Sequence, residues 1–166
     1  MNWKDKFPKE NRYFETENGI LYKGDCLEIM KEFPKWVFDA IITDPPYGVT
    51  QNNIDNKLPF DTMWNCLKKV RKDTTPIVLF GQGKFFFKLC LSNEKEYCYD
   101  LVWNKELVSW FLNANRMPLR QHEYIAVFYK KAGKYNPQKQ VWKHNHSKWR
   151  WKDKKEIKTW NVDKMT

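Results

Sequence analysis

The stretch Ile41-Ile42-Thr43-Asp44-Pro45-Pro46-Tyr47-Gly48 carries the strongest structural signal in the chain. It closes an apolar run over residues 37–42, and a short continuous apolar run is typical of a buried parallel strand. The two prolines remove two N–H donors, which leaves carbonyls free to accept hydrogen bonds. Asp44 adds acceptor oxygens and Tyr47 adds a flat aromatic face. At the carboxyl end of a strand, where open α/β sheets bind ligands, these groups suit a planar ligand with an amino nitrogen.

The four residues Asp44, Pro45, Pro46 and Tyr47 resemble the Asp-Pro-Pro-Tyr motif of S-adenosylmethionine-dependent methyltransferases that act on adenine N6 or cytosine N4 in DNA. The resemblance implies that these residues are catalytic and that the target base is flipped out of the duplex. Asp44 and the carbonyl of Pro45 would accept from the exocyclic amine, and Tyr47 would stack on the base. Positioning and charge would then supply the catalysis. The alternative interpretation is a strand followed by a rigid Pro-Pro turn.

A second segment, Gly24-Asp25-Cys26-Leu27, is similar to one that is common in the permuted group of these enzymes. There the acid is implied to contact the adenine of the cofactor. The resemblance therefore predicts that Asp25 and Cys26, together with Asp44 and Pro45, bind S-adenosylmethionine.

Asp25 also suits the N-cap of a helix over residues 26–33, with Glu28 completing a capping box. Cap and cofactor contact are compatible, so both interpretations stay open. Apolar periodicity and apolar runs predict further elements. The expected helices cover residues 60–71, with Trp64 in the core, and 84–91, and the expected strands cover residues 20–22, 76–80, 97–103 and 122–130.

Blocks after residue 100 extend the resemblance. Trp103-Asn104-Lys105 resembles the Trp-x-Lys strand end of the family, and Met117-Pro118 lies in a basic loop. His122-Glu123 resembles the block that opens the last, usually antiparallel, strand, and we expect this pair to brace the pocket by hydrogen bonding. Arg116 and Arg120 are candidate phosphate contacts, with a solvated surface as the alternative.

The tail over residues 133–166 interleaves aromatic and cationic side chains, a composition that suits base stacking and phosphate neutralisation. Tyr135-Asn136-Pro137-Gln138 is similar to the entry of the family's target-recognition region, and Lys148 and Arg150 are candidate DNA contacts. A basic tail whose tryptophans pack onto the sheet is the alternative. His144 and His146 have no evident third ligand, so we predict no metal site.

The expected fold class is α/β: a Rossmann-like methyltransferase sheet, mostly parallel with an antiparallel edge strand, and incomplete. We divide the chain into an irregular arm (1–18), a domain with the catalytic motif (19–132) and the basic, Trp-rich start of a target-recognition region (133–166). The resemblance covers residues 19–138. The Gly-rich cofactor loop that the permuted order places near the carboxyl end is absent, and the expected sheet has an uncovered edge.

Three functions follow from this pattern. The first is a site-specific DNA methyltransferase, adenine-N6 favoured over cytosine-N4 because of Tyr47, that is cut short or completed by a homodimer or a complementing chain. The second is a catalytically inactive DNA-binding or interaction protein derived from this fold. The third is an RNA or protein amide methyltransferase. Asp44 disfavours the protein version, since the glutamine enzymes are expected to carry Asn there.

Composition supports a folded protein with a polyanionic partner. The 166 residues include 42% hydrophobic residues and nine tryptophans, and the formal net charge is +10, which fits double-stranded DNA as the partner. The four cysteines form no C-x-x-C pair, as expected of reduced thiols. With no signal peptide or membrane-spanning run in the sequence, we expect a cytoplasmic protein of a restriction-modification type.

Overall fold

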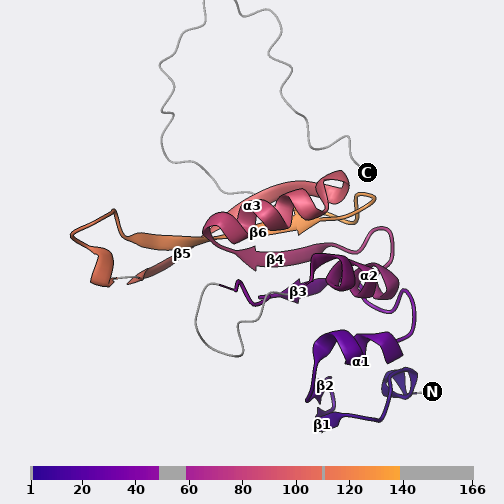
Figure 1. Cartoon of the computed structure of the whole chain (residues 1–166). Coiled ribbons are helices and arrows are strands. Elements are labelled where there is room, and N and C mark those ends of the chain that lie inside the picture. The colour runs from indigo at the N-terminus through magenta and orange to yellow at the C-terminus, as the bar shows by residue number, and fades with distance from the viewer. Residues whose placement is uncertain (1, 49–58, 110, 139–166) are drawn as a thin grey trace, which may run out of the picture. The chain divides into compact units, whose positions relative to one another are not determined.

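The described helices and strands all belong to one compact unit of the chain. The computed structural model describes residues 2–48, 59–109 and 111–138. The chain divides into a unit over Met1–Lys134 and a second unit over Tyr135–Thr166. Every element discussed below lies in the first unit (Figure 1).

A mixed sheet of four strands forms the centre of this unit. The strands are β3 (Ile41–Thr43), β4 (Ile77–Gly81), β5 (Tyr97–Ser109) and β6 (Arg120–Phe128), in the order β3-β4-β6-β5. β3 runs parallel to β4, whereas β6 is antiparallel to both β4 and β5. The α/β class with an antiparallel strand is therefore confirmed.

The antiparallel strand lies inside the sheet, and its expected position at the edge is wrong. Ala126 and Phe128 of β6 are fully buried, as suits a central strand, whereas β5 exposes Leu101 and Val102 at the edge. β6 folds back from β5 as a hairpin and places its apolar end between β5 and β4. The opposite edge is β3, which pairs with β4 alone among the described strands.

Three helices cover the face of the sheet that carries Ile77, Leu79, Ala126 and Phe128. They are α1 (Cys26–Glu32), α2 (Phe60–Val70) and α3 (Gly83–Ser92), and most of their buried side chains form one core cluster with these four residues. Ile29 of α1 and Val70 of α2 instead form a second cluster with Phe33. Burying such side chains contributes about 1.5–3 kcal/mol each. Trp64 is 4% exposed, which confirms its predicted place in the core.

The opposite face of the sheet is apolar but belongs to neither core cluster of the described residues. Strand register puts Ile42, Phe80, Ile125 and Leu101 on this face. Ile42 is 69% exposed. Val127 on the same face is 3% exposed, so the exposed part of the face lies around Ile42 and Leu101. Because parallel strands are normally buried on both faces, the region around Ile42 and the β3 edge form a surface suited to further packing.

The amino-terminal segment is a hairpin, which corrects the predicted irregular arm. A 3-10 helix, η1 (Trp3–Lys6), precedes β1 (Arg12–Thr16), which pairs antiparallel with β2 (Gly19–Tyr22). The Arg12 guanidinium donates hydrogen bonds to the carbonyls of Lys4, Phe7 and Pro8. The Arg12 side chain thus satisfies three backbone carbonyls of the amino-terminal segment. The sequence of this segment has no periodic pattern, so its ordered structure becomes evident only from these contacts.

A buried ionic network joins α2 to the short helix η2 (Glu94–Glu96). Glu96 pairs with Arg71 over 2.5 Å, and Asn93 donates to the second Glu96 oxygen over 2.8 Å. Burial raises the pKa of Glu96, but the hydrogen bond from Asn93 and the charges of Arg71 and Lys68 together lower it by more. The pKa of Glu96 is therefore below its ordinary value. The ionised carboxylate therefore stabilises this junction.

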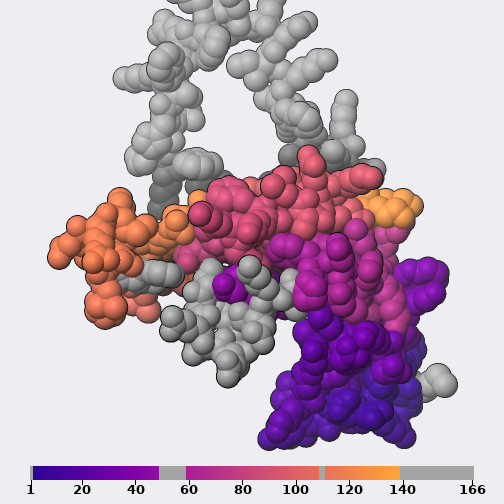
Figure 2. All heavy atoms as spheres, viewed as in Figure 1, coloured from indigo at the N-terminus to yellow at the C-terminus, as the bar shows by residue number. Residues whose placement is uncertain are grey.

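The β5–β6 hairpin extends past the end of β4. β4 ends at Gly81 opposite Tyr124, whereas the hairpin continues to the pair Ser109 and Arg120. We call residues 104–109 and 111–122 the hairpin extension; it contains the 3-10 helix η3 (Phe111–Asn113). Figure 2 shows these residues in orange, projecting from one side of the unit.

Candidate amine-binding site at the end of strand β3

Asp44 follows directly after β3 and so lies at the carboxyl edge of the parallel pair. β3 ends at Thr43 and β4 at Gly81, and parallel pairing places both ends at the same edge. The predicted strand over residues 37–42 is shorter and shifted: Phe38 forms only an isolated bridge with Arg71. This edge is where α/β sheets hold ligands.

Asp44 and Tyr47 are brought together as a hydrogen-bonded pair. The Tyr47 hydroxyl donates to Oδ1 of Asp44 over 2.7 Å. Burial raises the pKa of Tyr47, and the hydrogen bond and charge of Asp44 raise it further. The phenol therefore stays neutral at physiological pH and keeps the proton that it donates to Asp44.

The ring of Tyr47 is held by stacking. It lies 4.8 Å from the ring of Phe85 in α3 with an interplanar angle of 25°, and Phe60 of α2 contacts Phe85 from 5.8 Å. An offset stack of this kind contributes about 0.5–1.5 kcal/mol beyond burial. The sequence pattern did not identify Phe85 as a support for Tyr47, since their contact joins residues far apart in the chain.

Pro45 and Pro46 present acceptors and no donors. Pro45 is buried and Pro46 half-buried, and no described backbone N–H donates to either carbonyl. The carboxylate of Asp44 and the carbonyls of Pro45 and Pro46 therefore follow one another directly after the end of β3. An amino group with two hydrogens is the complementary ligand.

Glu123 lies near this site on β6. Its charge contributes, after burial and Asp44, to the raised pKa of Tyr47. Glu123 accepts a hydrogen bond from Lys105, across the β5–β6 pair, and the His122 ring packs edge-on against Tyr124 at 5.2 Å. The pairing of Glu123 with Lys105 was not anticipated from sequence.

The predicted cap at Asp25 is confirmed. Its Oδ1 accepts from the backbone N–H of Leu27 over 2.8 Å at the start of α1. Glu28 does not complete a capping box and instead pairs with Lys31 over 2.7 Å. Cys26 is the first residue of α1 and is exposed. Cofactor contact by Asp25 and Cys26 stays a prediction.

The predicted DNA contacts fall in two places. Arg116 and Arg120 are exposed on the hairpin extension. Lys148 and Arg150 lie outside the described residues, as do the loop over residues 49–58 and the tail from residue 139. Among the described residues, no three acidic, His or Cys side chains come together as a group that could hold a metal ion. Within the same residues, no helix is long and apolar enough to cross a membrane.

The fold is shared with solved methyltransferase structures. The chain aligns with the crystal structure of the M1.HpyAVI–SAM complex at 23% identity and a TM-score of 0.53, over 73% of this chain and 61% of that chain. A second crystal structure, of M1.HpyAVI, gives 24% identity and a TM-score of 0.51, over 72% and 61% of the two chains. At this identity the likeness defines the class of fold, a methyltransferase-type α/β sheet.

Sequence comparison defines the family. A family model described as DNA methylase matches residues 38–165, and the chain belongs to this DNA methylase family. Type II methyltransferase M.ScaI of Streptomyces caespitosus is 46% identical over 37 residues, which are 22% of this chain and 12% of the relative. Type II methyltransferase M.BamHI of Bacillus amyloliquefaciens is 45% identical over 49 residues, which are 25% of this chain and 12% of the relative. The matched segments thus cover a small part of each curated relative.

Proposed function

We propose that this chain forms the amine-binding part of an S-adenosylmethionine-dependent DNA methyltransferase, with adenine N6 as the favoured target. One observation carries the proposal: Asp44 and the donor-free Pro45-Pro46 segment end a parallel strand beside a stacked aromatic ring, within the segment that matches the family model. Tyr47 is the feature that favours adenine over cytosine.

The residues of this site would act by positioning the base. Asp44 and the carbonyl of Pro45 accept hydrogen bonds from the exocyclic amine, which turns the nitrogen lone pair away from these acceptors. The carboxylate also stabilises the positive charge that develops on the nitrogen during transfer. Tyr47, supported from behind by Phe85, offers its other face to the flipped base.

Asp25, Cys26, Asp44 and Pro45 are the residues that would hold the cofactor. These residues fit the cofactor, because the cap bond occupies Oδ1 of Asp25 and leaves Oδ2 as an acceptor for the adenine amine. Cys26, beside Asp25, is exposed. When bound, S-adenosylmethionine supplies an electrophilic methyl group on a positively charged sulfur.

The partners follow from charge and from the sheet. A net charge of +10 suits double-stranded DNA. Among the described strands β3 pairs only with β4, and Ile42 on its apolar face is exposed; both features support a homodimer or a complementing chain as the element that completes the sheet. A cytoplasmic site of action, next to DNA, completes the proposal.

Calorimetric titration with S-adenosylmethionine, followed by a methyl-transfer assay on DNA, tests the function. We expect Asp44→Ala to abolish transfer, and Asp25→Ala to weaken cofactor binding. Asp39→Ala is the matched control, since this acid precedes the other end of β3 and makes only an exposed ion pair with Lys72. Unchanged turnover in Asp44→Ala would contradict the mechanism. DNA binding without cofactor binding would favour the inactive DNA-binding protein.

A further inference from the structure

A small cavity lies between the turn after β4 and the hairpin extension. Its volume is about 160 Å³, below the roughly 300–1,000 Å³ of pockets that enclose a whole small molecule. The cavity therefore suits a single ring system. Its lining residues are Gln82, Asn113, Met117, Pro118, Leu119 and Arg120.

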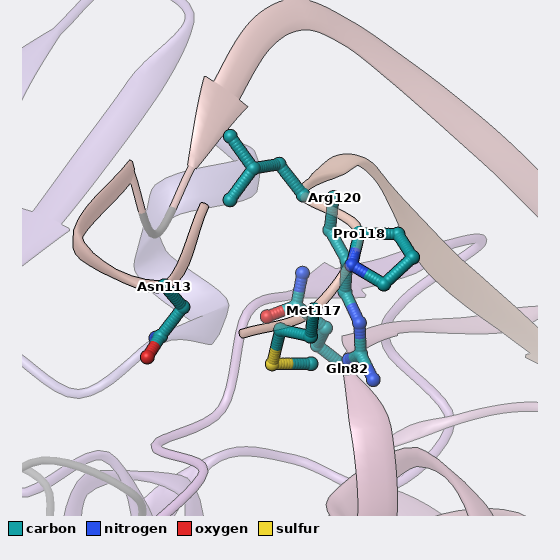
Figure 3. Close-up of a pocket in the computed structure, with 6 residues that line it drawn as sticks. Gln82, Asn113, Met117, Pro118 and Arg120 are labelled. Carbon is teal, nitrogen blue, oxygen red and sulfur yellow. The ribbon is translucent and has the colours of Figure 1, made fainter. Parts of the chain in front are cut away.

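The walls are apolar and the polar groups are few. Figure 3 shows Gln82, Met117 and Arg120 close together, with Asn113 across the cavity. The Gln82 amide donates from Nε2 to the carbonyl of His122 over 3.3 Å, which fixes its orientation and leaves Oε1 as an acceptor. A planar ligand with an N–H donor on its edge and apolar faces matches this lining.

The cavity and the amine-binding site are carried by neighbouring elements at the same edge of the sheet. Gln82 follows the last residue of β4, the strand that pairs with β3. Phe85, in the first turn of α3, stacks on Tyr47. The Arg120 guanidinium packs against the backbone on the same turn, since a Cβ on Gly83 would lie 3.3 Å from its Nη1. A ligand in the cavity would therefore lie at the same edge of the sheet as a base held by Tyr47.

We propose that this cavity binds a nucleobase that flanks the target base, and that Gln82 reads its edge. The inference rests on the proposed function and adds the residues that set sequence preference. Gln amides are suited to base edges, whereas Arg contacts bases or phosphates. Met117 and Pro118 supply the apolar surface against the ring. Contacts to flanking nucleotides are a general source of preference in enzymes that act on a flipped base.

A selection experiment tests this assignment. The full chain is incubated with duplexes in which an adenine faces an abasic site and the neighbouring positions are randomised. The DNA that stays bound to the protein is then recovered and sequenced. We expect the unchanged protein to enrich one base at a flanking position. Gln82→Leu should reduce this enrichment by on the order of tenfold, the usual effect of one lost base contact. Gln121→Leu is the matched control, because Gln121 is exposed beside the cavity without lining it.

A second variant protects the test against a folding defect. Met117→Ala should weaken retention of all sequences while keeping the preferred base, because it removes apolar contact and leaves the Gln82 amide in place. A flat profile for the unchanged protein, or an unaltered profile in Gln82→Leu, would overturn the assignment and leave the proposed function standing. Absence of any DNA retention by the unchanged protein would overturn both.

Discussion

Replacing Tyr47 by Phe separates the hydrogen bond of this residue from its ring. A hydrogen bond to a charged group contributes about 1.5–3 kcal/mol when shielded from water. Asp44 is exposed, so water replaces the lost donor, and we expect Tyr47→Phe to lower the free energy of unfolding by about 0.5–1 kcal/mol. For a chain of this size the melting temperature falls by about 1–4 °C.

Tyr47→Ala removes the ring as well and should cost more. The half-buried ring packs on the core and stacks on Phe85, so its loss should lower the free energy of unfolding by about 2–4 kcal/mol. Stacking on a base contributes about 1–3 kcal/mol, which corresponds to about 5- to 150-fold in affinity. We expect that loss in Tyr47→Ala, and an affinity close to that of the unchanged protein in Tyr47→Phe.

Two measurements check these values: urea unfolding for stability, and fluorescence anisotropy with a duplex whose adenine faces an abasic site for affinity. Because the pKa of Tyr47 is raised, its contribution to stability is complete below the ordinary phenol pKa of about 10 and is lost as the pH rises toward the folded value. Tyr47→Phe should remove that alkaline loss. Equal loss of affinity in both variants would refute the stacking role of the ring.

Three further substitutions test the fold around the site. Glu96→Gln leaves the buried Arg71 without its charge partner and should lower the free energy of unfolding in urea by about 3–5 kcal/mol. Since the pKa of Glu96 is lowered in the folded state, this difference between the two proteins should persist above about pH 4.3 and shrink as the pH falls through the folded pKa. Gly83→Ala places a side chain at φ +57° and should cost about 1–2 kcal/mol in thermal unfolding, unlike Gly19→Ala, where the added Cβ makes only an ordinary contact. Asp25→Ala should lose about 0.5–2 kcal/mol of unfolding free energy by urea titration, whereas Asp25→Asn should keep the cap.

Local patterns predicted most of the elements around the site. The helical spacing of Met63, Trp64 and Leu67 gave α2, and the apolar run before Gly81 gave β4. Such signals lie within a few residues of one another, so they can be read from the sequence. The Asp25 cap is local in the same sense, because its partner is Leu27.

Features that depend on distant contacts could not be read in this way. The position of β6 inside the sheet is set by pairing with both β4 and β5. The support of Tyr47 by Phe85 and the ion pair of Lys105 with Glu123 join residues 38 and 18 positions apart, counted from their numbers. The amino-terminal hairpin depends on Arg12, whose three carbonyl partners follow no periodic pattern. The Asp44-Pro45-Pro46-Tyr47 motif thus located the candidate site in the sequence, whereas the residues that surround it depend on tertiary packing.

The Pro45-Pro46 pair also limits aggregation. An edge strand with an exposed apolar side chain, as β3 has at Ile42, is a template on which identical chains can add strand after strand. Prolines offer no N–H to an incoming strand, so Pro45 and Pro46 stop the pairing segment from lengthening along the chain beyond β3. β3 therefore presents only the three residues Ile41–Thr43 for pairing, and the same two residues that keep acceptors free at the site keep this edge short, which makes it a poor template for a fibril.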